Sequence, residues 1–114
     1  MTQTISAKTP FPFGLGFNDT LSLNWTAFGI GERTIATVDN ISANPPGPTF
    51  TNKAPNAEVF PGEHGQDVAI GKAATFTMNG QGATVGIDYQ ITVSVTFNDG
   101  AKDAAVFLAP CRAA

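Results

Sequence analysis

Few residues in this chain are of the types that usually carry catalysis or bind metals. His64 is the single histidine and Cys111 the single cysteine, so no internal disulfide is possible. Glu63, His64 and Asp67 stand close together in a Gly-rich segment, but structural zinc sites usually take several Cys and His ligands. A Ser or Thr nucleophile needs a base beside it, and the chain has neither a Gly-x-Ser-x-Gly motif nor a P-loop lysine. We therefore expect no metal site, no cofactor and no catalytic residue.

Three carboxylates near the C-terminus, those of Asp88, Asp99 and Asp103, could supply a general acid and a general base. Each also has a structural explanation, because Asp99 fits a turn while Asp88 and Asp103 fit the starts of strands. The glycines at positions 80, 82 and 86 do not have the spacing of a dinucleotide-binding loop, and no helical pattern follows them. The sequence therefore predicts that the chain is not an enzyme.

The composition excludes some partners and favours others. The net charge is -3, and the six Lys and Arg residues are scattered, which argues against nucleic acid binding. No apolar run is long enough for a membrane-spanning helix, and the N-terminus lacks the pattern of a signal peptide, so we expect folding in a cytoplasm and no membrane contact. Charged residues make up 13%, about half the usual share. This is typical of proteins that end in an assembly and bind other proteins.

The clearest structural pattern lies in residues 87–99. Large apolar residues there alternate with polar ones, which predicts a strand with one buried face. Asn98, Asp99 and Gly100 then predict a tight hairpin turn that leads into a strand at 103–108. Shorter strands are expected at 21–25, 34–38 and 73–78, so the fold class is all-β, a sandwich or a barrel. The expected core residues are Trp25, Tyr89, Ile91, Val93, Val95 and Phe97.

Two segments fit no regular element, and they divide the chain. We expect an extended apolar arm at 1–17, one β-sandwich domain at 18–110 and a short tail at 111–114. The Pro- and Gly-rich segment 42–71 lies within the domain and could hide strands at 49–51 and 67–70. A connection of this length is uncommon unless it is functional, so its large apolar residues, Phe50, Val59 and Phe60, are candidates for partner binding.

The arm places a large apolar residue at every second position from 11 to 17, with Pro or Gly between them. These residues are Phe11, Phe13, Leu15 and Phe17. In extended form they would share one face, and the bare opposite face would admit another backbone. Two interpretations remain open: the arm is the first strand of the domain's own core, or it docks onto a neighbouring subunit by strand addition.

A family resemblance adds to this picture. The residues that carry it are Asp19, Trp25, the run GATVGIDYQITV at 82–93, and the final hairpin. They resemble small immunoglobulin-like virion proteins of tailed bacteriophages, of the fiber–tail adaptor or head decoration type. The resemblance implies an immunoglobulin-like β-sandwich in which the Tyr89 hydroxyl bonds to upstream backbone, as in a tyrosine corner. It also implies that Trp25 packs directly on Ile91, where antibody domains have a disulfide.

The resulting hypothesis is a structural accessory protein of a virion, assembled in the host cytoplasm. The first expectation is a capsid cement or decoration protein that braces the major capsid protein, as a homo-oligomer or bound to the capsid lattice. The alternative is a fiber–tail adaptor that contacts tail or fiber proteins. A third possibility, from another class, is a glycan-binding sandwich that uses Trp25, Tyr89 or the phenylalanines as aromatic platforms, although Phe is a poorer platform because it has no polar group.

Overall fold

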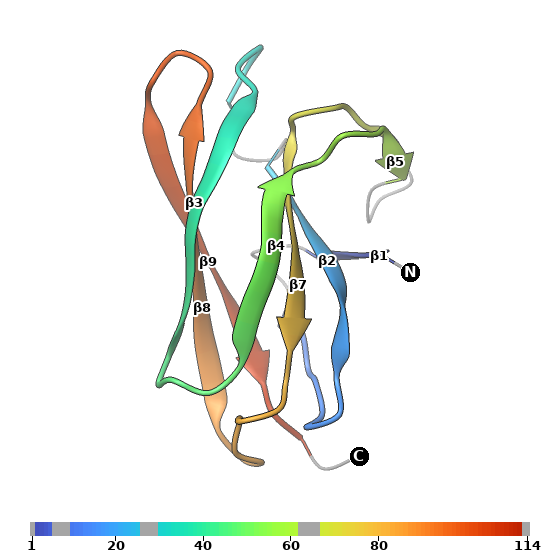
Figure 1. Ribbon diagram of the computed structural model, residues 1–114, viewed down its shortest axis with the longest axis vertical. Coiled ribbons are helices and arrows are strands. Elements are labelled where there is room, and N and C mark those ends of the chain that lie inside the picture. Colours follow the sequence, from blue (N-terminus) through green and yellow to red (C-terminus); the bar gives the residue numbers. More distant parts are fainter. Residues whose placement is uncertain (1, 6–9, 26–29, 62–66, 113–114) are drawn as a thin grey trace.

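The computed structural model describes residues 2–5, 10–25, 30–61 and 67–112 (Figure 1). These residues form strands and no helix, which confirms the all-β prediction. The strands are β1 (Thr2–Ile5), β2 (Asn18–Asn24), β3 (Ile35–Asn44), β4 (Thr49–Pro55), β5 (Phe60–Pro61), β6 (Asp67–Val68), β7 (Ala73–Asn79), β8 (Asp88–Phe97) and β9 (Lys102–Pro110).

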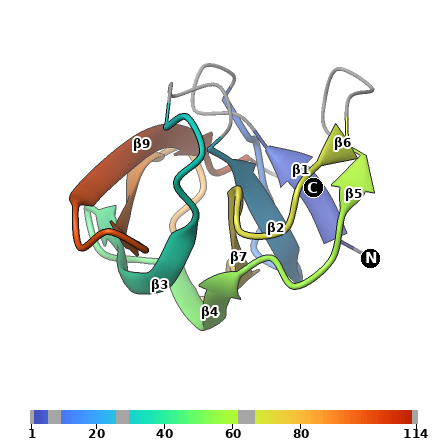
Figure 2. The same cartoon turned by 90° about the horizontal axis from the view of Figure 1, so that it is seen from above.

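The strands form two larger sheets and one small ribbon. One sheet has the strand order β1-β2-β7-β4 and the other has the order β3-β8-β9, while β5 and β6 pair only with each other. All of these pairs are antiparallel except β1 with β2, which is parallel. The two larger sheets face each other (Figure 2), an arrangement compatible with a β-sandwich.

The core lies between the two sheets, as the period of two in β8 requires. The apolar residues of β8 from Tyr89 to Phe97 are at most 2% exposed, and Trp25 is fully buried. Leu21 and Leu23 of β2 and Phe76 of β7 fill the core from the opposite sheet. The Phe76 ring stacks on the Phe107 ring of β9 at 6.4 Å between centroids, and this contact joins the two sheets. All six residues expected in the core are thus buried.

The predicted hairpin between β8 and β9 is also present. The Phe97 N–H donates to the Ala101 carbonyl over 2.8 Å, and the Asp99 carboxylate accepts from the Ala101 N–H over 3.0 Å. Gly100 has a φ of 87°, in the left-handed region where glycine is preferred. Asp99 and Gly100 therefore form the turn that the sequence predicted.

Segment 42–71 contains more strand than the sequence indicated. β3 continues to Asn44, β4 begins at Thr49, and only the run of prolines between them forms a connection, which includes a cis Asn44–Pro45 peptide bond. The strands suspected at 49–51 and 67–70 are present as β4 and β6, although β6 ends at Val68. Pro55 is tolerated in β4 because β4 is the edge strand of its sheet.

The N-terminal arm packs on its own domain. The Phe11 and Phe13 N–H groups donate to the Leu108 and Pro110 carbonyls over 2.8 and 3.0 Å, and the Phe13 carbonyl accepts from the Arg112 N–H. The Phe13 side chain is 4% exposed and belongs to the core. The burial of Phe13 agrees with the interpretation in which the arm completes the domain's own core. The assignment of Phe13 to partner binding is corrected accordingly.

The expected single face of four apolar side chains does not form. A turn, with a 3.1 Å hydrogen bond from the Phe17 N–H to the Gly14 carbonyl, interrupts the extended arm and leaves Leu15 exposed. The Phe11 and Phe17 rings meet edge to face at 5.4 Å and are partly buried against the core. The sequence also gave no sign of β1, which adds a parallel strand beside β2 and buries Ile5.

Tyr89 closes the core at the end opposite the β8–β9 turn. Its hydroxyl accepts a 2.7 Å hydrogen bond from the N–H of Thr84, five residues upstream. The Phe13 ring lies 6.0 Å away, and Gly47 lies against the Tyr89 ring so closely that a Cβ there would meet Cε1 at 2.7 Å. The Tyr89 ring can therefore occupy this position only because Gly47 has no side chain.

The first prediction concerns the arm. Phe13→Ala should lower the free energy of unfolding by about 3–5 kcal/mol, since it empties a core position. Leu15→Ala, the matched control in the exposed turn, should change it by no more than about 0.5 kcal/mol. Urea unfolding followed by circular dichroism measures both. Equal effects of the two substitutions would contradict the cis packing of the arm.

The second prediction concerns Gly47. Gly47→Ala should cost about 1–3 kcal/mol in the free energy of unfolding because the new methyl group displaces the Tyr89 ring. Gly16→Ala is the control, because a Cβ at Gly16 meets nothing within 4 Å. Thermal unfolding of both variants measures the difference. A Gly47→Ala protein as stable as the control would show that Tyr89 is not held in this way.

Candidate functional site

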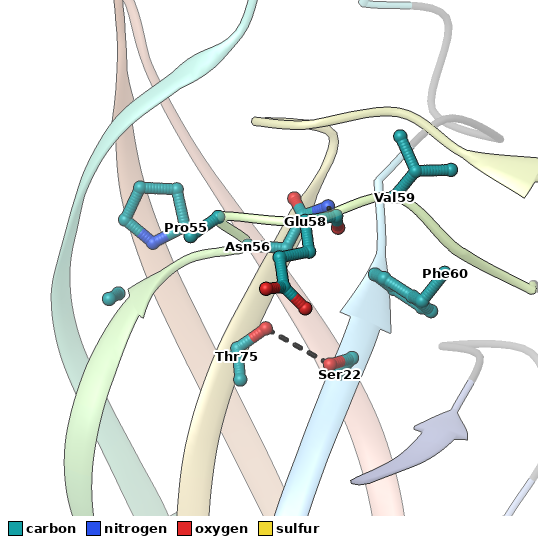
Figure 3. Close-up of a pocket in the computed structure, with 9 residues that line it drawn as sticks. Ser22, Pro55, Asn56, Glu58, Val59, Phe60 and Thr75 are labelled. Carbon is teal, nitrogen blue, oxygen red and sulfur yellow. Dashed lines mark hydrogen bonds between the residues drawn. The ribbon is translucent and has the colours of Figure 1, made fainter.

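A cavity lies on the outer side of the β1-β2-β7-β4 sheet, where the chain leaves β4 for the small β5–β6 ribbon (Figure 3). Leu21 and Leu23 point into the core, so Ser22 between them faces outward, and Thr75 does the same on β7. The cavity volume is about 350 Å³. The lining residues are Ser22, Ala54, Pro55, Asn56, Ala57, Glu58, Val59, Phe60 and Thr75.

Asn56 holds the segment that forms the pocket. Its side-chain NH₂ donates to the carbonyls of Glu58 and Ala69 over 2.9 and 3.0 Å, and its side-chain oxygen accepts from the Ala73 N–H over 3.0 Å. Its backbone N–H donates to the Ala73 carbonyl, and its backbone carbonyl accepts from the Gly71 N–H. Asn56 is 7% exposed, so this buried amide ties both ends of the ribbon segment (residues 56–61 and 67–70) to the start of β7.

A hydroxyl pair forms the floor of the pocket. Ser22 and Thr75 are direct partners in the β2–β7 register, and their hydroxyl oxygens are 3.0 Å apart in a hydrogen bond. Ser22 is buried, so the pair faces the cavity mainly through Thr75. Figure 3 shows the Glu58 carboxylate directed toward this floor from the segment above it. Phe60 stands beside Ser22 and supplies an aromatic wall.

The loop residues predicted to bind a partner separate into two places. Val59 is 54% exposed and Phe60 is partly exposed, and both line the pocket. Phe50 instead packs against the core, with its ring 5.8 Å from Phe76 in an edge-to-face contact. Because Phe50 is only partly buried, its assignment to partner binding stays a prediction. Ile70, which the sequence analysis did not select, is 57% exposed just after β6.

Sequence reasoning also missed the polar residues of the pocket. Ser22 and Thr75 occupy polar positions of alternating strands, which indicates that they face outward but not that they pair with each other. Asn56 follows a proline and looks like an ordinary turn residue. Only the folded chain shows that its amide is buried and fully hydrogen-bonded.

The three carboxylates considered for acid–base chemistry lie apart and have structural contacts. Asp88 pairs with Arg112 at 3.2 Å, and Asp99 accepts from the backbone in the hairpin turn. Asp103 accepts from the Trp25 indole N–H over 3.3 Å. These contacts account for the presence of each residue, and the expectation that the chain is not an enzyme stays a prediction.

One carboxyl group, that of Asp39, has a shifted pKa. Hydrogen bonds from the Thr37 and Thr96 hydroxyls, each 2.6 Å long, lower the pKa of Asp39 below its ordinary value of 3.8, and the charge of Lys102 adds to the effect. The lowered pKa stabilises the charged form. This is the opposite of what a proton donor near neutral pH needs.

Metal ligands do not gather within the part of the chain that the structure describes. No group of three or more His, Cys, Asp or Glu residues there could hold an ion. Glu63 and His64 lie outside the described residues, and Cys111 is buried. Across the described ranges, no helix has the length and apolar character needed to cross a membrane.

Comparison with known proteins adds no relative. No protein-family model, no curated protein and no solved structure matches the chain.

The third prediction concerns Asn56. Asn56→Ala leaves three backbone groups without their side-chain partner, at a cost of about 1–3 kcal/mol. Hydrogen exchange of the Gly71 and Ala73 amides should become at least about tenfold faster through local opening. Asn40→Ala is the control, since Asn40 is exposed on β3. Unchanged exchange at both amides in the Asn56→Ala protein would contradict the anchoring role.

Proposed function

We propose that this chain is an immunoglobulin-like, non-enzymatic binding protein of a tailed-phage virion, a cement or decoration protein that holds the major capsid protein. The observation that carries the binding role is the exposure of Val59 and Ile70 on the ribbon segment, outside the closed core. The particle is inferred from the sequence resemblance around Trp25 and residues 82–93.

The strand order supports the immunoglobulin-like assignment. Constant-type immunoglobulin domains have one sheet with strands A, B, E and D and another with C, F and G. If β1 to β4 are named A to D and β7 to β9 are named E to G, the sheet β1-β2-β7-β4 has the order A-B-E-D and the sheet β3-β8-β9 has the order C-F-G. The β5–β6 ribbon is then an insertion between D and E. Tyr89 near the start of β8 bonds to upstream backbone, in keeping with a tyrosine corner. The parallel pairing of β1 with β2 departs from the antiparallel pattern usual for such sheets.

The ribbon segment has the character of a contact surface. Val59 precedes β5 and Ile70 follows β6, and the hydrogen bonds of Asn56 hold these two parts of the chain together. Neither side chain is needed for the core, which is closed by residues of the two larger sheets. Exposed apolar groups gathered in one place commonly mark a protein interface.

A second exposed apolar place lies on the other sheet. Val106 and Leu108 of β9 are both exposed on its outer face, opposite Thr92 and Gln90 of β8. A chain with apolar contacts on two sides suits a role as a brace between neighbouring subunits, where several weak contacts act together. The arm no longer supports lattice binding, because Phe13 is part of the chain's own core.

Two aromatic residues bear on the glycan-binding alternative. Trp25 and Tyr89 are 0% and 2% exposed, so these two platforms cannot stack on a sugar without unfolding of the core. No other observation favours sugars over protein. The fiber–tail adaptor therefore remains as the second candidate, since it too would use protein contacts.

The fourth prediction tests the function on purified particles of the phage that encodes the chain. Quantitative mass spectrometry should find on the order of hundreds of copies per particle, whereas an adaptor would be present in about six to a few tens of copies, as tail symmetry dictates. Particles that lack the protein should rebind it when it is added back. Absence of the chain from purified particles would overturn the virion assignment.

Rebinding to the same particles also tests whether Val59 and Ile70 form the contact surface. The double variant Val59→Asp and Ile70→Asp should fold but rebind at least about tenfold less tightly, because charges replace buried apolar contacts. Val85→Asp is the control, since Val85 is exposed in the connection between β7 and β8, and this connection lies at the end of the sandwich away from β5 (Figure 1). Rebinding of the double variant at the level of wild type would contradict the proposed contact surface.

A further inference from the structure

We infer that the pocket beneath the ribbon segment receives an arginine side chain of the partner protein. This inference rests on the proposed binding function and names the chemistry of the contact. The pocket is lined by Val59 and Phe60 of the proposed contact surface, so a partner that covers these residues would also cover the pocket. The charge, the hydrogen-bonding groups and the walls of the cavity all suit a guanidinium group.

The charge of the pocket is negative. Glu58 is the one charged residue among the lining residues, and no described cation forms an ion pair with its carboxylate. Lys72, a cation of the nearby chain, directs its ammonium to the carbonyls of Gly31 and Arg33, each over 2.6 Å. A cationic group on a partner would therefore meet an acceptor without displacing an existing pair.

The hydrogen-bonding groups of the pocket are mainly acceptors. The Glu58 carboxylate offers acceptors only. The Ser22 and Thr75 hydroxyls together have two protons and four lone pairs, and their mutual bond uses one of each, which leaves more lone pairs than protons. The Asn56 amide is occupied by backbone groups. The pocket is thus suited to a ligand that mainly donates.

The walls favour arginine among the donor-rich side chains. A guanidinium has five N–H donors, pairs with a carboxylate through two parallel bonds, and stacks on aromatic rings. Glu58 supplies the carboxylate, Phe60 supplies the ring, and Pro55 and Val59 would cover the aliphatic stem. The volume of about 350 Å³ lies at the low end of ligand pockets, which suits one side chain rather than a long peptide.

The fifth prediction uses N-acetyl-L-arginine methylamide as a probe, with the full chain labelled with ¹⁵N for an NMR titration. The Ala57, Glu58 and Thr75 amides should shift in a saturable way, with a dissociation constant of about 1–10 mM. The corresponding citrulline derivative, which keeps the shape but lacks the charge, should bind at least about tenfold more weakly. The lysine derivative should bind between the two, because it cannot form the paired bonds.

Two variants identify the acceptor. Glu58→Gln should weaken binding of the arginine probe at least about tenfold, since it removes the charge and keeps the shape. Glu32→Gln makes the same change outside the pocket and should leave the affinity as in wild type. The inference would be overturned if the arginine and citrulline derivatives bound equally well, or if Glu58→Gln bound the arginine probe as tightly as wild type does. It would also be overturned if methyl galactoside, a probe for sugar binding, bound more tightly than the arginine probe.

Rebinding to particles separates this inference from the proposed function. If the wild-type chain rebinds to particles but the probe does not shift the pocket amides, the arginine pocket is wrong and the binding function stands. If the chain does not bind particles but the probe binds with the stated selectivity, the pocket stands and the phage assignment fails. If both the binding function and the arginine pocket are correct, Glu58→Gln lowers the affinity for the arginine probe and also lowers rebinding to particles.

Discussion

The arrangement of the candidate site depends on one buried side chain, the amide of Asn56. A buried amide is costly unless its donors and acceptor are all satisfied, and here they are satisfied by backbone groups of Glu58, Ala69 and Ala73. These bonds, together with the buried side chain of Val68 in β6, give the ribbon segment a fixed conformation. The segment therefore holds Val59 and Glu58 outside the sandwich at little entropic cost on binding.

The sandwich makes this possible because its main core cluster takes no side chain from the ribbon segment. Phe76 and Phe107 join the sheets, and the Phe13 ring packs on Tyr89 at one end. The arm, for which the sequence left both docking and packing on its own domain open, contributes Phe13 to this core. Apolar groups on the ribbon and on β9 remain at the surface, on two different sides of the molecule (Figure 2). Such a division between closed core and exposed contacts suits a protein that braces its neighbours.

The local patterns of the sequence predicted the fold well where one face of a strand is buried. The alternation in β8 and the Asp-Gly turn after it specify burial and a reversal within a few residues, so both were predictable. The turn at Gly14 was not, because alternating glycines fit an extended chain and a turn equally well. The pocket was also not predictable, since it depends on the pairing of Ser22 with Thr75 and on long-range bonds of Asn56. Val59 and Phe60, which line the pocket, were selected as candidates from their apolar character alone.

Cryo-electron microscopy of intact particles tests the central claim most directly, because it shows what the ribbon segment touches. The account predicts density for this chain on the capsid surface, with residues 56–61 and 67–70 against a neighbouring protein and a basic side chain of that protein next to Glu58. Density in which the chain is present but this segment faces solvent would contradict the account.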